Sequence, residues 1–247
     1  MVSSAVPAPA AIRIAARFCG PPGSGNGGYT CGRLAAGLRP PVEVTLRRPP
    51  PLDRELTILR NPHGQALMDG DVAVAEARHA RLELVPPACP GLGAATAAAA
   101  RYHGLAEHAF PTCFVCGPGR APGDGLRIFA GEVPDDGMVA APWRPDPGLA
   151  DADGRVDEAF VWAALDCPGA WAWLATLDNP LVLGRLTAEI DAPVMAGQPH
   201  IVGGWRLGRE GRKYFSGTAI WRADGTICAR ARATWIEVDP ELFGAAG

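Results

Sequence analysis

A single carboxylate, Asp166, stands in the middle of an apolar stretch, residues 157–177 (DEAFVWAALDCPGAWAWLATL). Past Glu158, every side of a helix formed by this stretch would be apolar, which is typical of a buried helix. A lone carboxylate on a buried helix is costly unless it is paired or protonated. The sequence therefore predicts that Asp166 faces a site, where a half-buried carboxylate could act as a general base on water or as a nucleophile.

Two other interpretations of this stretch remain open. Pro168 forbids an ordinary helix interior at that point and is favoured in a first helical turn, so Asp166 or Cys167 could simply cap a second helical segment. A membrane span is the other alternative. The charge of Asp166, the Cys167-Pro168-Gly169 break and the lack of basic flanking residues argue against it.

A second candidate site is Asn26-Gly27-Gly28, at the end of a glycine-rich loop, residues 17–29, which leads into a predicted helix over residues 30–38. Glycines at a helix start let the backbone approach a ligand, and the free N–H groups there can polarise a carbonyl. Asn26 could cap the helix or bind that carbonyl, but it cannot act as an acid. An ordinary turn is the alternative. Neither a dinucleotide fingerprint nor a Walker loop surrounds these residues.

Cys113 and Cys116 form a C-x-x-C pair. With Cys89, His103 and His108 upstream, four zinc ligands could be assembled. No second C-x-x-C exists, however, and the upstream residues fall in a loose connector. A redox pair lacks thioredoxin-like surroundings. The sequence therefore predicts two packed thiols, and neither a metal nor a cofactor is expected.

Composition narrows the function classes. The 247 residues carry a net charge of −3, so nothing indicates nucleic acid or an anionic membrane surface as a partner. The first residues lack a basic start followed by an apolar run, so no signal peptide is expected. Seven cysteines without a secretion signal predict reduced thiols and a cytoplasmic location.

The chain contains two weakly similar halves. Residues 68–84 align with residues 223–239 through an Asp-Gly pair, which is a strong hairpin signal. Each half shows the order helix, strand, proline break, strand, strand, Asp-Gly and long strand. The predicted strands cover residues 42–46, 56–59, 66–68, 72–84, 126–130, 138–141, 186–190, 201–207, 213–222 and 226–238. The predicted division is a disordered start (1–11), an N-terminal unit (12–93), a helical connector (94–110), a C-terminal unit (111–240) and a tail (241–247).

Two segments carry a resemblance to a known family. CFVCGPGRAPGDGLRIF (residues 113–129) resembles the C-F-V-C-G-x-x-N-x-x-G-L segment of acyl-CoA thioesterase-like hotdog proteins, without the usual Asn. AALDCPGAWA (residues 163–172) resembles the acidic L-[LI]-D-E-x-x-G helix of the same superfamily. The resemblance covers most of the chain as a tandem, or double, hotdog. It implies an α+β fold in which two curved antiparallel sheets, each wrapped round a central helix, join into one continuous sheet.

The resemblance also distributes the site residues between the halves. In the second half, Asp166 takes the family's acidic position, but Asp157-Glu158-Ala159 stands where the family has H-G-G. The second half therefore keeps only the acid.

The first half keeps the complementary piece. Asn26-Gly27-Gly28 fits H-G-G with Asn in place of His, and Ala35 stands at the acidic position. Hotdog thioesterases build each site between two units, so the resemblance implies one composite site in which Asn26-Gly27-Gly28 faces Asp166. The second site would be dead.

The activity implied is hydrolysis of an acyl-CoA-type thioester. Asp166 would be the base or nucleophile, and the N–H of Gly27 or Gly28 would stabilise the oxyanion. The acyl chain would lie along aromatic residues between the halves, namely Trp162, Trp171 or Trp173. Family analogy also makes a homo-oligomer an expectation.

A non-enzymatic acyl-CoA or lipid-binding hotdog protein is the alternative. The missing His, Ala35 and the Pro168 that follows the acid all favour it. The enzyme requires Asp166 to come within about one water's span of the first helix's N-terminus. If the two lay on opposite sides of the sheet, the enzyme interpretation would fail.

Overall fold

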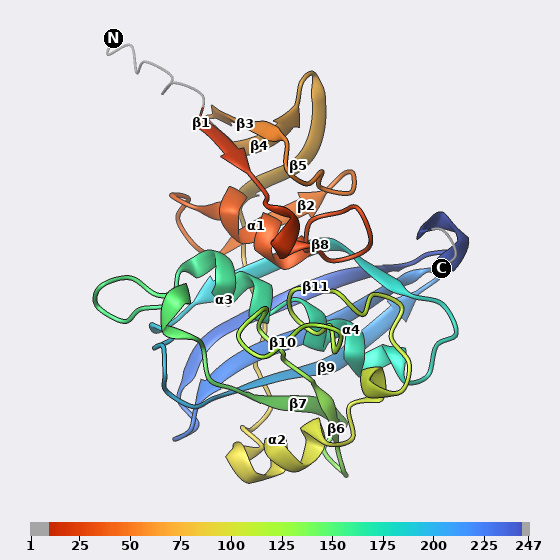
Figure 1. Ribbon diagram of the computed structural model, residues 1–247. Helices are drawn as coiled ribbons and strands as arrows, with labels where there is room; N and C mark the ends of the chain where they lie inside the picture. The colour runs from red at the N-terminus through yellow and green to blue at the C-terminus, as the bar shows by residue number, and fades with distance from the viewer. Residues whose placement is uncertain (1–9, 244–247) are drawn as a thin grey trace.

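The computed structural model describes residues 10–243, so the start and the last residues of the chain lie outside this description. One sheet of eleven strands runs through the molecule in the order β1-β3-β4-β5-β2-β8-β11-β10-β9-β7-β6, with antiparallel pairing throughout (Figure 1). The strands of the first half are β1 (Ala10–Arg13), β2 (Val42–Leu46), β3 (Glu55–Asn61), β4 (Gly64–Asp69) and β5 (Val72–His79). Those of the second half are β6 (Gly131–Val133), β7 (Met138–Trp143), β8 (Leu181–Ile190), β9 (His200–Glu210), β10 (Lys213–Arg222) and β11 (Ile227–Glu237).

The sheet order shows the repeat directly. The first half contributes β3-β4-β5-β2, and the second half contributes the equivalent strands in the reverse order, β8-β11-β10-β9. The halves join through β2 and β8, where Val42 lies opposite Ala188 and Val44 opposite Leu186. The predicted fold of two curved sheets joined into one continuous sheet is confirmed.

The hairpin signals act as expected. Gly70 joins β4 to β5 with φ 57°, and Gly225 lies between β10 and β11 with φ 88°. Such positive φ values favour glycine. The strand predicted over residues 126–130 is wrong, because Arg127 adopts φ 52° and interrupts the extended chain. The long strand predicted to reach residue 84 ends at His79, and β1 begins inside the stretch expected to be disordered.

Four α-helices and four short 3₁₀ turns lie within residues 10–243. They are α1 (Gly27–Ala35), α2 (Gly91–Ala99), α3 (Glu158–Ala164) and α4 (Cys167–Leu174), with 3₁₀ turns at Ala16–Phe18, His103–Leu105, Pro147–Leu149 and Pro240–Phe243. None of the helices in residues 10–243 is long and apolar enough to cross a membrane.

Two helix predictions need correction. The helix expected over residues 157–177 is two helices, because Pro168 lacks an N–H and its ring excludes a continuous helix, so the chain turns at Asp166 (ψ −85°). The first helix starts at Gly27 rather than at residue 30, because the Asn26 side chain accepts a hydrogen bond from the Tyr29 N–H at 2.8 Å and caps it there.

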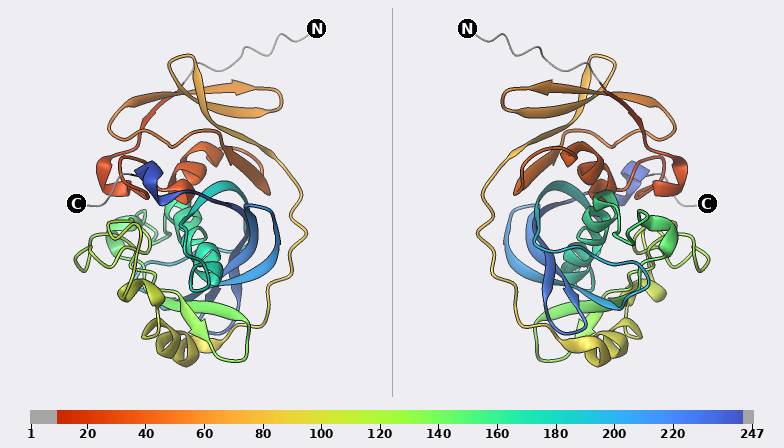
Figure 2. Two further views of the ribbon diagram at one scale, coloured as in Figure 1. Left: turned by 90° about the vertical axis from the view of Figure 1, so that its right-hand side faces the viewer. Right: turned by 90° about the vertical axis from the view of Figure 1, so that its left-hand side faces the viewer.

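The core lies between these helices and the sheet. In Figure 2, α3 and α4 lie inside the curved wall formed by the strands of the second half, and α1 lies beside α3. One apolar cluster draws residues from both halves, among them Val44, Leu67, Ala163 and Leu186. After β5 the chain runs without regular structure along the outside of the molecule to α2 (Figure 2). The packing therefore brings the start of α1 against the α3–α4 break.

Candidate functional site

Asp166 and the start of α1 are in direct contact. Its Oδ2 atom accepts hydrogen bonds from the Gly28 N–H (2.8 Å) and from Asn26 Nδ2 (2.9 Å). Only glycine permits this approach, since a Cβ atom on residue 28 would lie 2.5 Å from the Asp166 Cβ and 2.6 Å from the Trp162 carbonyl oxygen. The carboxylate of the second half thus meets the helix start of the first half.

The two polar side chains have distinct roles at this contact. Asp166 occupies the N-cap position of α4, yet its side chain makes no capping hydrogen bond to that helix and bonds to α1 instead. Asn26 caps α1 through Oδ1 and donates through Nδ2 to Asp166. A cap alone therefore does not account for the carboxylate at position 166.

Burial gives Asp166 unusual proton chemistry. The residue is 2% exposed, and this burial raises the pKa of its carboxyl group to about 7. The hydrogen bond from the Gly28 N–H acts in the opposite direction and lowers that pKa. Negative charge on the nearby Cys113 raises the pKa of Asp166 further, and the hydrogen bond from the Asn26 side chain lowers it. Its Oδ1 atom is buried without a hydrogen-bond partner in residues 10–243. Such a carboxyl group can take or release a proton near neutral pH.

A cavity of about 850 Å³ opens beside this contact, and its size falls in the range of small-molecule sites. Asn26, Gly27 and Asp166 line it. The N–H of Gly27, the first in α1, finds no acceptor within the described part of the chain. Most of the remaining wall is apolar and includes Leu46, Phe110, Trp171, Leu174, Leu177, Leu181, Leu183, Trp235, Leu242 and Phe243.

Two tryptophans predicted to bind substrate lie elsewhere. Trp162 is buried in the α1–α3 contact, against Gly32. Trp173 donates from Nε1 to Ser216 Oγ at 3.1 Å, and its ring packs under the Arg206 guanidinium. Neither lines the cavity, whereas Trp171 does.

Three thiols gather next to Asp166. The Sγ atoms of Cys113, Cys116 and Cys167 all lie within 4.8 Å of one another, and the Cys113–Cys167 separation is 3.7 Å. Hydrogen bonds from the other two thiols lower the pKa of Cys113. The C-x-x-C spacing indicated Cys113 and Cys116 but not Cys167, because Cys167 belongs to a helix far along the chain. Neither Cys89 nor His103 belongs to this group.

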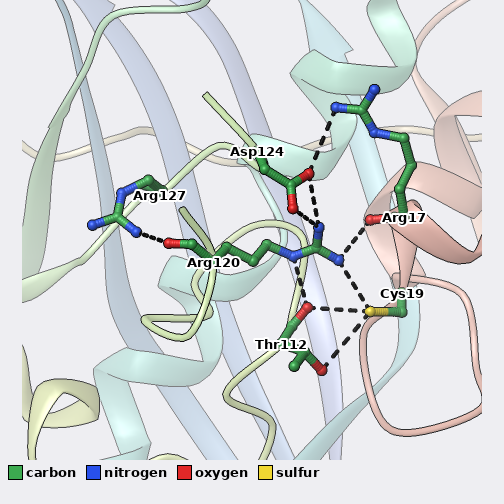
Figure 3. Close-up of polar contacts among 6 residues, drawn as sticks. All are labelled: Arg17, Cys19, Thr112, Arg120, Asp124 and Arg127. Atoms are coloured by element: carbon green, nitrogen blue, oxygen red, sulfur yellow. Dashed lines mark hydrogen bonds and ion pairs between the residues drawn. The ribbon is translucent and has the colours of Figure 1, made fainter. Parts of the chain in front are cut away.

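An arginine fixes the loop that carries the C-x-x-C pair (Figure 3). The Arg120 side chain, 8% exposed, pairs with Asp124 at 3.1 Å. Its Nε donates to the Thr112 carbonyl oxygen at 2.7 Å and its Nη2 to the Arg17 carbonyl oxygen at 2.6 Å. Because Arg17 belongs to the loop that leads to α1, this network ties the cysteine loop to the Asn26 side of the cavity.

Within residues 10–243, the start of α3 has no counterpart of the contact between Asp166 and the start of α1. Asp157 Oδ1 accepts a hydrogen bond from the Ala159 N–H at 2.8 Å, so Asp157 caps α3 as Asn26 caps α1. Ala35, at the position equivalent to Asp166, carries no carboxylate. A polar hollow lined by Asp157 and Glu158 does not include Ala35. Within residues 10–243, the polar groups predicted for the site lie together at the start of α1 and not at the start of α3.

Comparison of the sequence with protein-family models and with curated proteins finds no match. Solved structures do match. A protein of unknown function with a hot dog fold from Alicyclobacillus acidocaldarius superposes with a TM-score of 0.60 at 15% identity, covering 94% of each chain. The tesB protein of Mycobacterium avium subs paratuberculosis gives a TM-score of 0.56 at 12% identity, covering 87% of this chain and 88% of that one. With these likenesses and the mirrored strand order, the chain has the hotdog fold in its double form, two units in one polypeptide.

Proposed function

We propose that the chain hydrolyses the thioester bond of an acyl-CoA-type substrate at one composite site between the two hotdog units. The observation that carries the proposal is the hydrogen bond from the Gly28 N–H to Asp166 at the wall of the cavity. It joins the acid of one unit to the helix start of the other, which is the arrangement that the enzyme requires. The likeness to the hotdog structures supplies the fold alone.

The groups present suit attack by water on a thioester carbonyl. Asp166 takes a proton from water, and the oxygen of that water forms the new bond to the carbonyl carbon. The N–H of Gly27 stabilises the oxyanion, with the positive end of the α1 dipole behind it. The C–S bond then breaks, and the leaving thiolate recovers the proton. Gly28 orients Asp166 rather than the substrate, because its N–H is already bonded to the carboxylate.

The cavity suits an acyl chain. Its wall is mostly apolar, and Trp171, Leu174 and Phe110 line it together with Asp166 and Gly27. Burial of apolar surface favours binding of a hydrocarbon chain there. All seven cysteines are free thiols, which fits the reducing cytoplasm in which we place the protein.

The test is thioester hydrolysis across a panel of acyl-CoA substrates, from short to long chains. Asp166→Asn should lower kcat by about 10²–10⁴-fold, the usual loss on removal of a general base. Glu158→Gln is the matched control. It makes the same carboxylate-to-amide change at the exposed start of α3 and should leave kcat unchanged. Equal turnover in wild type and Asp166→Asn would remove Asp166 from the mechanism.

A binding protein without turnover is the second candidate. It is favoured by the donors at the site, since Gly28 N–H and Asn26 Nδ2 are both taken by Asp166, and Asn26 cannot supply a proton as an acid would. Saturable acyl-CoA binding by wild type, with no hydrolysis of any panel member, would favour this candidate and contradict the enzyme.

A further inference from the structure

The cluster of Cys113, Cys116 and Cys167 is unexplained by thioester hydrolysis. The first two come from the loop that Arg120 holds, and Cys167 is the first residue of α4. All three side chains belong to buried residues, yet all three line the 850 Å³ cavity. They are therefore enclosed by protein on one side and reachable from the cavity on the other.

We propose that Cys113, Cys116 and Cys167 bind one zinc ion, with the fourth coordination position open toward the cavity. This inference does not rest on the proposed hydrolysis, because a metal site can be present whether or not thioesters are turned over.

The spacing of the sulfur atoms fits a tetrahedral ion. Zinc–thiolate bonds of about 2.3 Å at tetrahedral angles place two sulfurs about 3.8 Å apart. The Cys113 and Cys167 Sγ atoms are 3.7 Å apart, and Cys116 Sγ completes a triangle with no side above 4.8 Å. A disulfide would require sulfurs at about 2.05 Å. Thiolate ligands also select zinc over the hard cations magnesium and calcium.

His108 supports the cluster and is not its fourth ligand. Its Nε2 atom lies 3.4 Å from Cys116 Sγ, while its Nδ1 accepts a hydrogen bond from the Phe110 N–H at 2.9 Å. A neutral imidazole that accepts at Nδ1 carries its proton on Nε2. The ring therefore donates to Cys116 Sγ. Asn26 Nδ2 lies 3.9 Å from Cys113 Sγ on the other side. Donors of this kind orient metal-bound thiolates.

Three protein ligands with an open fourth position distinguish reactive zinc sites from closed structural ones, which use four. No fourth thiol joins the cluster within residues 10–243. The cavity therefore offers the remaining position to water or to a donor atom of a bound molecule. Asp166 precedes Cys167 directly, so the ion would lie at the polar end of the cavity, beside the start of α1.

Cobalt titration of the reduced, metal-free wild-type chain is the test, because the absorption spectrum of bound cobalt(II) depends on the type and geometry of its ligands. We expect saturation at one cobalt per chain, a thiolate-to-cobalt charge-transfer band and strong visible bands of tetrahedral coordination. These bands should disappear when zinc replaces the cobalt. The chain purified without chelator should carry zinc in the same ratio. Absence of the charge-transfer band in reduced wild type would overturn the proposal without recourse to any variant.

Variants assign the ligands. Cys113→Ser and Cys167→Ser should each lose the charge-transfer band, and circular dichroism shows whether each remains folded. Cys89→Ser is the matched control and should bind cobalt as wild type does, since Cys89 lies outside the cluster.

His108→Gln should keep the metal. Loss of the metal from that variant would overturn the open fourth position. Unchanged binding in a folded Cys113→Ser, Cys167→Ser double variant would overturn the site. So would a Cys113–Cys167 disulfide that persists in thiol reductant.

Discussion

The burial of Asp166 suits its proposed role but comes at a cost to stability. Its Oδ2 atom has two donors, but its Oδ1 atom has none among the described residues. A carboxylate in this position is poorly solvated, and hydrogen bonds replace the lost water at only one of its two oxygens. Desolvation accordingly raises the pKa of Asp166. Residues in such positions are more often kept for chemistry than for stability.

Asp166→Asn separates the proposed catalytic role of Asp166 from a structural one. Asparagine keeps the shape of the side chain and the acceptor for the Gly28 N–H while it removes the buried charge. The free energy of unfolding should therefore rise by about 0–2 kcal/mol. Urea unfolding of metal-free protein at neutral pH measures it, with Glu158→Gln as the exposed control, expected within about 0.5 kcal/mol of wild type. A destabilisation greater than about 1 kcal/mol would mean that the charge itself holds α1 in place.

At the scale of elements, the site depends on how closely α1 and α3 approach. Gly28 and Gly32 lie one helical turn apart on α1 and face α3. A Cβ on Gly32 would lie 2.7 Å from the Ala159 Cα and 2.8 Å from the Trp162 Cβ. The helix backbones are therefore in near contact, and this contact holds the Gly28 N–H at hydrogen-bonding distance from Asp166.

Gly32→Ala tests this packing. Overpacking against the α3 backbone should destabilise the protein by about 1–3 kcal/mol, which exceeds the roughly 1 kcal/mol that alanine gains in a helix. Gly93→Ala on α2 is the matched control and should be neutral or stabilising, because beyond its chain neighbours and its own helix backbone no atom would lie within 4 Å of the new Cβ. Denaturant midpoints measure both. A stabilised Gly32→Ala variant would show that the helices can separate freely.

At the scale of the whole molecule, the two halves share their sheet and their core. β2 and β8 pair directly across the boundary, and one apolar cluster includes Val44 of the first half and Leu186 of the second. The polar groups of the site also come from both halves. Neither half can therefore lose its structure without exposing apolar surface of the other.

Unfolding should accordingly be a single cooperative transition. Scanning calorimetry of the metal-free chain should give one peak with equal calorimetric and van't Hoff enthalpies. The intrinsic tryptophan fluorescence and the far-ultraviolet circular dichroism should follow the same curve, since tryptophans of both the α1–α3 contact and the sheet report on it. Two resolved transitions would contradict the shared core.

The sequence by itself determined the local structure wherever local chemistry decides. The Asp-Gly pairs mark two of the hairpins, β4–β5 and β10–β11, because their turns need positive φ. The alternating strands then predicted the sheet, and Pro168 indicated a break in the long apolar helix as one of the open alternatives. The repeat and the family resemblance also predicted that Asn26-Gly27-Gly28 faces Asp166, and the structure brings these residues into contact.

Only the tertiary structure decided which side chains share a cavity. Cys113 and Cys167, for example, are 54 positions apart in the sequence. Such contacts depend on the close approach of α1 to α3 and on the direction of α4 after its break. The tryptophans show the same limit. The family resemblance implied an acyl chain along Trp162, Trp171 or Trp173, and of these three only Trp171 lines the cavity. Side-chain direction is set by packing, which local sequence patterns do not encode.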